Sequence, residues 1–187
     1  MRHTKSVRIG VLLTMGFLEV EAAGVLELVR LVRRAGGAVE AVTVAKGRPG
    51  LEGAAGAVWT PRYAVVVRPE LEALVIPGGQ GMAKAGRDPV LAAWLREAWP
   101  ALDAVFLGAN AAVLLAEAGL APSAVAAHPR ARPALEAQHL RVVEAPIHRE
   151  GRVVSTRGYA HLLRALAEYL EARGLPAREA LVHLDLQ

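Results

Sequence analysis

Two side chains that can transfer protons stand where a ligand site could form. Glu21 lies in the first turn of an expected helix, where a carboxylate gains from the helix dipole. Glu19 is only two positions away and points in another direction, so these two carboxylates do not form an acid/base pair. His128 follows a short expected strand over residues 124–127. We therefore interpret Glu21 and His128 as the candidate catalytic residues.

The other five histidines are weaker candidates for a functional role. None shows HExxH or another close metal-ligand spacing, and no metal or other cofactor is expected. These residues are expected at the surface: His3, His139, His148, His161 and His183.

Two small-residue turns follow apolar segments. Pro77-Gly78-Gly79-Gln80-Gly81 ends a predicted strand, and its glycines would let backbone N–H groups approach a ligand or an oxyanion. It lacks the spacing of a phosphate-binding loop. Gly108-Ala109-Asn110-Ala111 resembles a strand-to-helix elbow, whose tip in many enzymes holds a nucleophile. The tip here would be Ala109, which has no attacking atom. The alternative is an ordinary tight turn in which Asn110 caps the helix.

The composition excludes several classes of protein. The 187 residues contain no cysteine, which rules out disulfides, zinc–thiolate sites, iron–sulfur clusters and a cysteine nucleophile. The net charge is +4, but the arginines are scattered without interleaved aromatic residues, so no nucleic-acid partner is expected. No apolar run reaches the roughly 18 residues of a membrane span, and the basic start lacks a cleavage site. We expect a cytoplasmic protein. The arginine-rich, amide-poor composition fits a heat-adapted protein or GC-rich codons.

Apolar runs alternate with segments of helical periodicity. The chain from residue 7 to residue 44 reads as strand, helix and strand, which is a βαβ unit and implies a parallel sheet. Asp88 and Pro89 form a helix start, as N-cap and first helical residue. Residues 47–60 read as loop or edge structure. The pattern predicts strands over residues 7–13, 39–44, 63–67, 71–76, 103–108, 125–127, 140–143 and 153–156, and helices over 20–35, 89–99, 111–118 and 159–172.

This alternation predicts a three-layer α/β/α sandwich around a mostly parallel, flavodoxin-like sheet, with residues 1–187 forming a single domain. In such folds the ligand crevice lies beyond the carboxyl ends of the strands. The predicted ligand-binding residues are therefore those of the two turns: Gly78, Gly79, Gly108, Ala109 and Asn110.

Four segments in order resemble the ThiJ/PfpI superfamily, which has the class I glutamine amidotransferase-like fold. They are GVLLTMGFLEVEAAGVLELV, LEALVIPGGQG, DAVFLGANAAVLLAEAGL and GRVVSTRGYAHLLRALAEYL, and together they cover nearly the whole chain. LLAEAGL is especially similar to the branch that contains isocyanide hydratases and the sensor domains of AraC-type regulators.

The resemblance implies an acidic residue at Glu21 and a histidine at His128. It places the family's cysteine nucleophile at Ala109 when aligned from the following helix, or at Phe106 when aligned on the preceding strand. Neither residue is a thiol, so covalent catalysis is not expected. The resemblance also implies a homodimer.

Three functions follow as alternatives. The first is a non-catalytic member, a pseudoenzyme, that binds a small molecule in the former active-site pocket. The second is a non-covalent hydrolase or hydratase that uses Glu21 and His128. The third is a regulatory sensor that acts through a protein partner.

Overall fold

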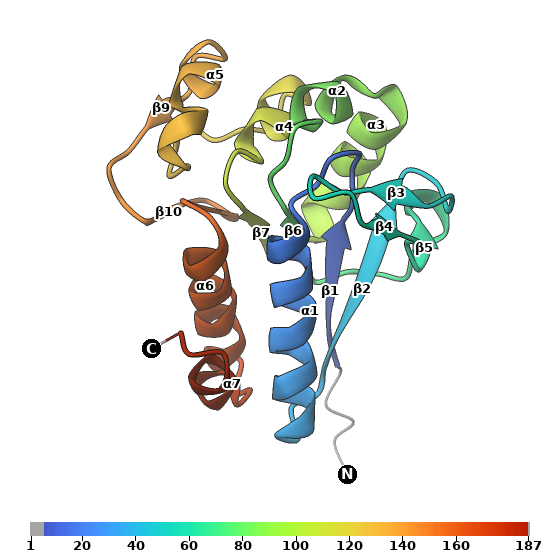
Figure 1. Cartoon of the computed structure of the whole chain (residues 1–187), viewed down its shortest axis with the longest axis vertical. Coiled ribbons are helices and arrows are strands. Elements are labelled where there is room, and N and C mark those ends of the chain that lie inside the picture. Colours follow the sequence, from blue (N-terminus) through green and yellow to red (C-terminus); the bar gives the residue numbers. More distant parts are fainter. Residues whose placement is uncertain (1–5, 187) are drawn as a thin grey trace.

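A seven-stranded sheet forms the centre of the computed structural model, which describes residues 6–186 (Figure 1). Its strand order is β10-β11-β7-β6-β1-β2-β5, and only β10 runs antiparallel to its neighbour. The inner order β2-β1-β6-β7-β11 is that of flavodoxin-like folds, so the predicted fold class is confirmed. The strands are β1 (Val7–Leu12), β2 (Val39–Ala45), β5 (Tyr63–Ala64), β6 (Ala73–Ile76), β7 (Ala104–Leu107), β10 (Ile147–Glu150) and β11 (Val153–Thr156).

Helices cover both faces of this sheet (Figure 1). One face packs against α1 (Glu19–Arg34), α6 (Tyr159–Glu171) and α7 (Ala177–His183). The other packs against α2 (Met82–Arg87), α3 (Pro89–Ala98) and α4 (Ala112–Glu117), and α5 (Arg132–Glu136) extends that layer. The molecule is therefore the three-layer sandwich that the alternating pattern predicted.

Alternate residues of each buried strand enter opposite cores, because side chains along a strand point to opposite faces of a sheet. In β6, Ala73 and Val75 belong to the α1 and α6 side, whereas Leu74 and Ile76 belong to the α3 side. The same division holds in β7. Strands buried on both faces read as continuous apolar runs, which is why these two were predictable from the sequence.

Several predicted elements differ from the observed ones. The predicted strand over residues 63–67 is only β5, followed by a 3₁₀ turn (Val65–Val67). The loop expected over residues 47–60 contains a small hairpin, β3 (Leu51–Glu52) and β4 (Val58–Trp59). The predicted strands near residues 125 and 140 shorten to β8 (Ala124–Val125) and β9 (Arg141–Val142). These two pair with each other and lie outside the main sheet.

The helix starting at Pro89 begins as predicted. Asp88 accepts hydrogen bonds from Val90 N and Leu91 N at 2.9 Å and 3.2 Å, which satisfies two of the free N–H groups of the first turn. Its other carboxylate oxygen lies 2.6 Å from Lys46 Nζ, so the N-cap also ties α3 to the end of β2.

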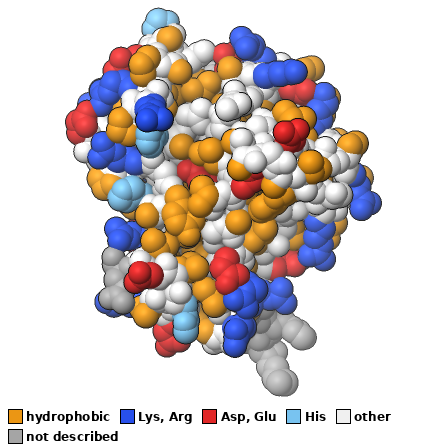
Figure 2. All heavy atoms as spheres, viewed as in Figure 1, with side chains coloured by type: hydrophobic (Ala, Val, Ile, Leu, Met, Phe, Trp, Pro, Cys, Tyr) orange, Lys and Arg blue, Asp and Glu red, His pale blue; other side chains and the backbone are white. Residues whose placement is uncertain are grey.

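Charged side chains are dispersed over the surface. On the face drawn in Figure 2, Lys and Arg are intermixed with Asp and Glu around the outline, and hydrophobic side chains gather toward the middle. Within residues 6–186, no helix is both long and apolar enough to cross a membrane.

Candidate functional site

Glu21 is the buried carboxylate at the centre of the candidate site. It lies in the first turn of α1 and is 1% exposed. Its Oε2 accepts a hydrogen bond from Gly78 N at 2.7 Å, and its Oε1 accepts one from Ala109 N at 3.1 Å. The side chain therefore bridges the turns that follow β6 and β7, beside the position where the strand order reverses.

Two glycines lie beside this carboxylate, and at Gly108 any side chain would collide with it. A Cβ on Gly108 would lie 2.0 Å from Glu21 Oε2, which is far inside a normal contact. Gly158, which has a φ of +144°, approaches Oε1 from the turn before α6. The Glu21 carboxylate thus fills the volume that a side chain after β7 would need.

Burial and hydrogen bonding act in opposite directions on the acidity of Glu21. Loss of water raises the pKa of the carboxyl group, because burial disfavours the charged form. The N–H groups of Gly78 and Ala109 lower the pKa, because they stabilise the carboxylate, but the effect of burial is larger. Glu21 is therefore a weaker acid than an exposed glutamate.

Asn110 has a different role from the helix cap considered in the sequence. Its Oδ1 accepts from Gly79 N at 2.7 Å, and its Nδ2 donates to Gly79 O at 2.8 Å. Helix α4 follows Ala111 without any side-chain cap, so the capping interpretation is wrong. Asn110 instead links the turn after β7 to the turn after β6 through these two hydrogen bonds.

The N–H groups of the Pro-Gly-Gly turn are already in use within the protein. Gly78 N donates to Glu21 and Gly79 N donates to Asn110. At Gly79, φ is +155° and a Cβ would lie 2.2 Å from Gly16 O, so this position requires glycine. A ligand that used these amides as an oxyanion site would have to displace one of the two side chains.

Ala109 lies at the edge of the site and is partly exposed. Among the described residues, the only non-glycine residues with positive φ are His139 and Asp185, so Ala109 lacks the backbone strain of a nucleophile elbow. The residue whose Cα lies against the Glu21 carboxylate is Gly108. Phe106, the other alignment for the nucleophile, is 1% exposed and packs edge-on against Tyr169 in the core.

His128 is joined to the site through its backbone. Its N–H donates to Ala109 O at 3.1 Å. The imidazole is exposed, and its Nδ1 accepts a hydrogen bond from Arg130 N at 3.3 Å, at the start of a 3₁₀ turn (Pro129–Ala131). The structure therefore brings Glu21 and both glycine turns together, whereas the His128 ring faces its own turn.

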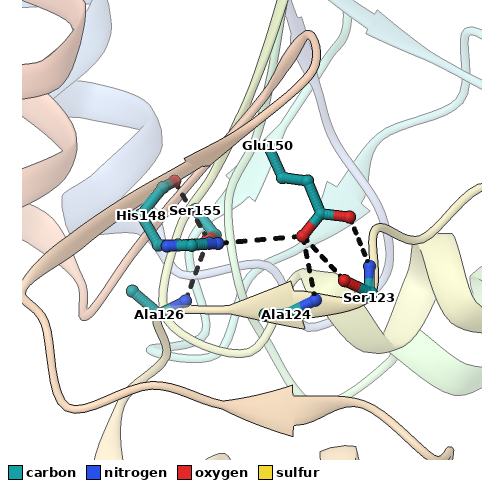
Figure 3. Close-up of polar contacts among 6 residues, drawn as sticks. All are labelled: Ser123, Ala124, Ala126, His148, Glu150 and Ser155. Atoms are coloured by element: carbon teal, nitrogen blue, oxygen red, sulfur yellow. Dashed lines mark hydrogen bonds and ion pairs between the residues drawn. The ribbon is translucent and has the colours of Figure 1, made fainter.

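A polar network that the sequence did not reveal holds the segment leading to His128 (Figure 3). Ser155 Oγ, in β11, accepts from Ala126 N at 2.9 Å and donates to His148 O at 3.3 Å. The Glu150 carboxylate accepts from Ser123 N, Ser123 Oγ and Ala124 N at 2.7–3.2 Å, and lies 3.8 Å from His148 Nε2. His148 is thus partly enclosed rather than a freely exposed residue, because it is packed between β8 and β11.

Metal ligands do not gather in the part of the chain from residue 6 to residue 186. No group of three His, Cys, Asp or Glu side chains there is placed to hold an ion.

Comparison with known proteins agrees with this geometry. The family model described as the DJ-1/PfpI family matches residues 7–172. The chain belongs to the DJ-1/PfpI family. No curated protein sequence matches it.

Solved structures of this family share the fold. A ThiJ/PfpI family protein from Pseudomonas syringae has a TM-score of 0.81 at 20% identity, over 96% of this chain and 75% of that one. Drosophila melanogaster DJ-1beta has a TM-score of 0.80 at 20% identity, over 97% of this chain and 99% of that one. A mutant DJ-1 superfamily protein from Salmonella typhimurium, with a cysteine replaced by alanine, has a TM-score of 0.79 at 23% identity, over 97% and 99% of the two chains.

Proposed function

We propose that this DJ-1/PfpI family member binds a small molecule at the Glu21 site and forms no covalent intermediate with it. The observation that carries the proposal is the Glu21 carboxylate held between Gly78 N and Ala109 N, against the bare backbone of Gly108. No cysteine exists in the sequence, and neither Ala109 nor Gly108 supplies an attacking atom. Without that atom, a site retains binding but loses nucleophilic chemistry.

The chemistry of the site favours a ligand with a hydrogen-bond acceptor. When Glu21 is protonated, its O–H can donate to a carbonyl oxygen, and burial favours that protonated form. Ala109, whose N–H donates to this carboxyl group, and Asn110 beside it are partly exposed. The proposed ligand is a small aldehyde, ketone or amide that rests on these two residues.

Thermal unfolding in the presence of propionaldehyde, propionamide and propionate tests this proposal. We expect the two carbonyl probes to raise the melting temperature of the wild type and not that of Glu21→Gln. Glu27→Gln is the matched control, because Glu27 lies on the same helix and pairs with Arg30 at the surface. No response to any probe, or equal responses in Glu21→Gln and the wild type, would contradict the proposal.

A non-covalent hydrolase or hydratase is the second candidate. It is favoured by the raised pKa of Glu21, because an acid or base works best when its pKa lies nearer the working pH. It also needs the His128 ring to turn from Arg130 N toward Ala109. We expect turnover of an aldehyde, isocyanide or peptide to fall at least tenfold in Glu21→Gln if this candidate is correct. Absence of turnover in the wild type would exclude it for these substrates.

The proposal for the whole chain is a cytoplasmic homodimer in which residues 1–187 fold as one domain. Exposed valines support self-association: Val20 is 55% exposed and Val58 is 68% exposed. Glu19 brings their segments together, because its carboxylate accepts from Ala55 N at 2.9 Å, just before β4. A sensor that acts through a different protein partner is the alternative use of this surface, and co-purification from native extract distinguishes the two.

A further inference from the structure

A cavity lies beside Gly81, at the end of the turn that begins at Pro77. It has a volume of about 530 Å³ and lies beyond the carboxyl ends of β1 and β2. That volume is within the usual range of small-molecule sites, roughly 300–1,000 Å³. Its walls are mainly apolar and come from the loop after β1, the segment before β3, and helices α2 and α3. They include Leu13, Met15, Pro49, Leu51, Ala85 and Leu91.

The charged residues of this cavity leave one cation without a partner. Lys46, Lys84 and Asp88 line it, and two of them neutralise each other because Lys46 Nζ lies 2.6 Å from Asp88 Oδ2. Asp88 is further occupied as the N-cap of α3. Lys84 forms no ion pair with any residue described between 6 and 186. The cavity therefore carries a net positive charge of one.

Thr14 provides an unused polar group in the same wall. The residue is 4% exposed, and its Oγ1 has no hydrogen-bond partner among the described residues. A buried hydroxyl without a partner is energetically unfavourable, so it is a group that a bound molecule could satisfy. Apolar walls, one free ammonium and one free hydroxyl are the features that a molecule with an apolar chain and a single anionic head would match.

We propose that this cavity binds an amphipathic organic monocarboxylate. The apolar chain packs among Leu13, Leu51 and Leu91, and the carboxylate pairs with the Lys84 ammonium. The Thr14 hydroxyl donates to the bound molecule. This site is separate from the Glu21 site, because Gly81 lines the cavity whereas Gly78 and Gly79 hold Glu21 and Asn110.

Calorimetric titration with octanoate tests the proposal. We expect saturable binding of one octanoate per chain, weaker binding of octanol and none of octylammonium. Lys84→Met removes the charge and keeps the length of the side chain, and it should weaken octanoate at least tenfold while leaving octanol unchanged. Arg48→Met is the matched control, because Arg48 is exposed nearby and does not line the cavity.

Two further measurements locate the bound molecule. With methyl-labelled methionine, the NMR signal of Met15 should move on titration, whereas that of Met82, which is 1% exposed and outside the cavity, should not. Thr14→Val should weaken octanoate without lowering protein stability, and Glu21→Gln should bind octanoate as the wild type does. The proposal is overturned if octanoate does not bind, if Met15 is unaffected, or if Lys84→Met and Arg48→Met behave alike.

Discussion

The Glu21 carboxylate and a side chain at position 108 could not occupy the site together. The carboxylate is held by Gly78 N and Ala109 N, so it cannot withdraw without leaving buried N–H groups unpaired. Gly108 cannot gain a side chain while the carboxylate stays. In this arrangement the buried carboxylate of Glu21 occupies the space that a side chain at position 108 would need.

The Gly108→Ala substitution measures how tightly this space is filled. We expect it to lower the free energy of unfolding by about 1–3 kcal/mol, because the added Cβ would lie 2.0 Å from Glu21 Oε2 and the buried site must shift. Urea denaturation gives this value. Gly47→Ala is the control, since its Cβ would meet only Pro49 Cδ at 3.3 Å. Equal effects of the two substitutions would show that the Glu21 site is not closely packed.

The raised pKa of Glu21 predicts a pH-dependent stability. The folded state binds this proton more tightly than the unfolded chain, whose glutamate has its ordinary value of 4.5. The stabilisation is therefore complete below about pH 4.5 and is lost as the pH rises through the higher folded pKa. Relative to Glu21→Gln, the wild type should lose stability between pH 4.5 and neutrality, as urea denaturation at several pH values would measure. Parallel profiles of the two proteins would contradict the predicted direction.

Residue types predicted part of the site. Glu21 could be selected because a glutamate in a first turn within Gly-Phe-Leu-Glu-Val-Glu is placed near the ligand side of a parallel sheet. The hydrogen-bond partner of Asn110 could not be predicted from the sequence, because Gly79 is 31 positions away and a local helix cap is the simpler expectation. The network of Ser123, Glu150 and Ser155 was also hidden, since these residues meet only after β10 and β11 pair.

At the scale of elements, apolar runs predicted the central strands and the long helices because burial on both faces of the sheet leaves a strong pattern. The short helices α2, α5 and α7 have seven residues or fewer, too few turns to show a clear period. The edge strand β10, Ile-His-Arg-Glu, resembles a turn because only its pairing with β11 makes it a strand. Pairing with β11 decided this last element.

Substitution of Asp88 measures how much this N-cap contributes to the stability of α3. Asp88→Ala should lower the free energy of unfolding by about 1 kcal/mol, because α3 loses its N-cap and Lys46 loses its partner. Asp88→Asn keeps an accepting oxygen and removes only the charge, so we expect a smaller loss, since exposed ion pairs contribute little. Urea denaturation of both variants separates the two contributions. Equal losses in the two variants would show that the ion pair, and not the cap, stabilises this region.

The whole molecule is expected to associate through the surface that carries Val20 and Val58. Light scattering should give twice the 19.8 kDa of the chain, and Val58→Glu should shift the mass toward that of a monomer because a charge would be buried in the interface. Val182→Glu is the control, as Val182 is 53% exposed on α7. A monomeric wild type, or dissociation by Val182→Glu alone, would contradict this choice of surface.

The two outer strands of the sheet have a consequence for the behaviour of the protein at high concentration. At one edge of the sheet, β5 has only two residues and is followed by a 3₁₀ turn. It therefore offers almost no backbone hydrogen-bonding groups to an incoming chain. At the other edge β10 carries His148, Arg149 and Glu150, and the Glu150 carboxylate is bound to the segment at Ser123. Short or charged edge strands of this kind oppose the addition of a strand from another molecule. We therefore expect little fibril growth from the native state, even though the central strands β6 and β7 are uninterrupted apolar sequence.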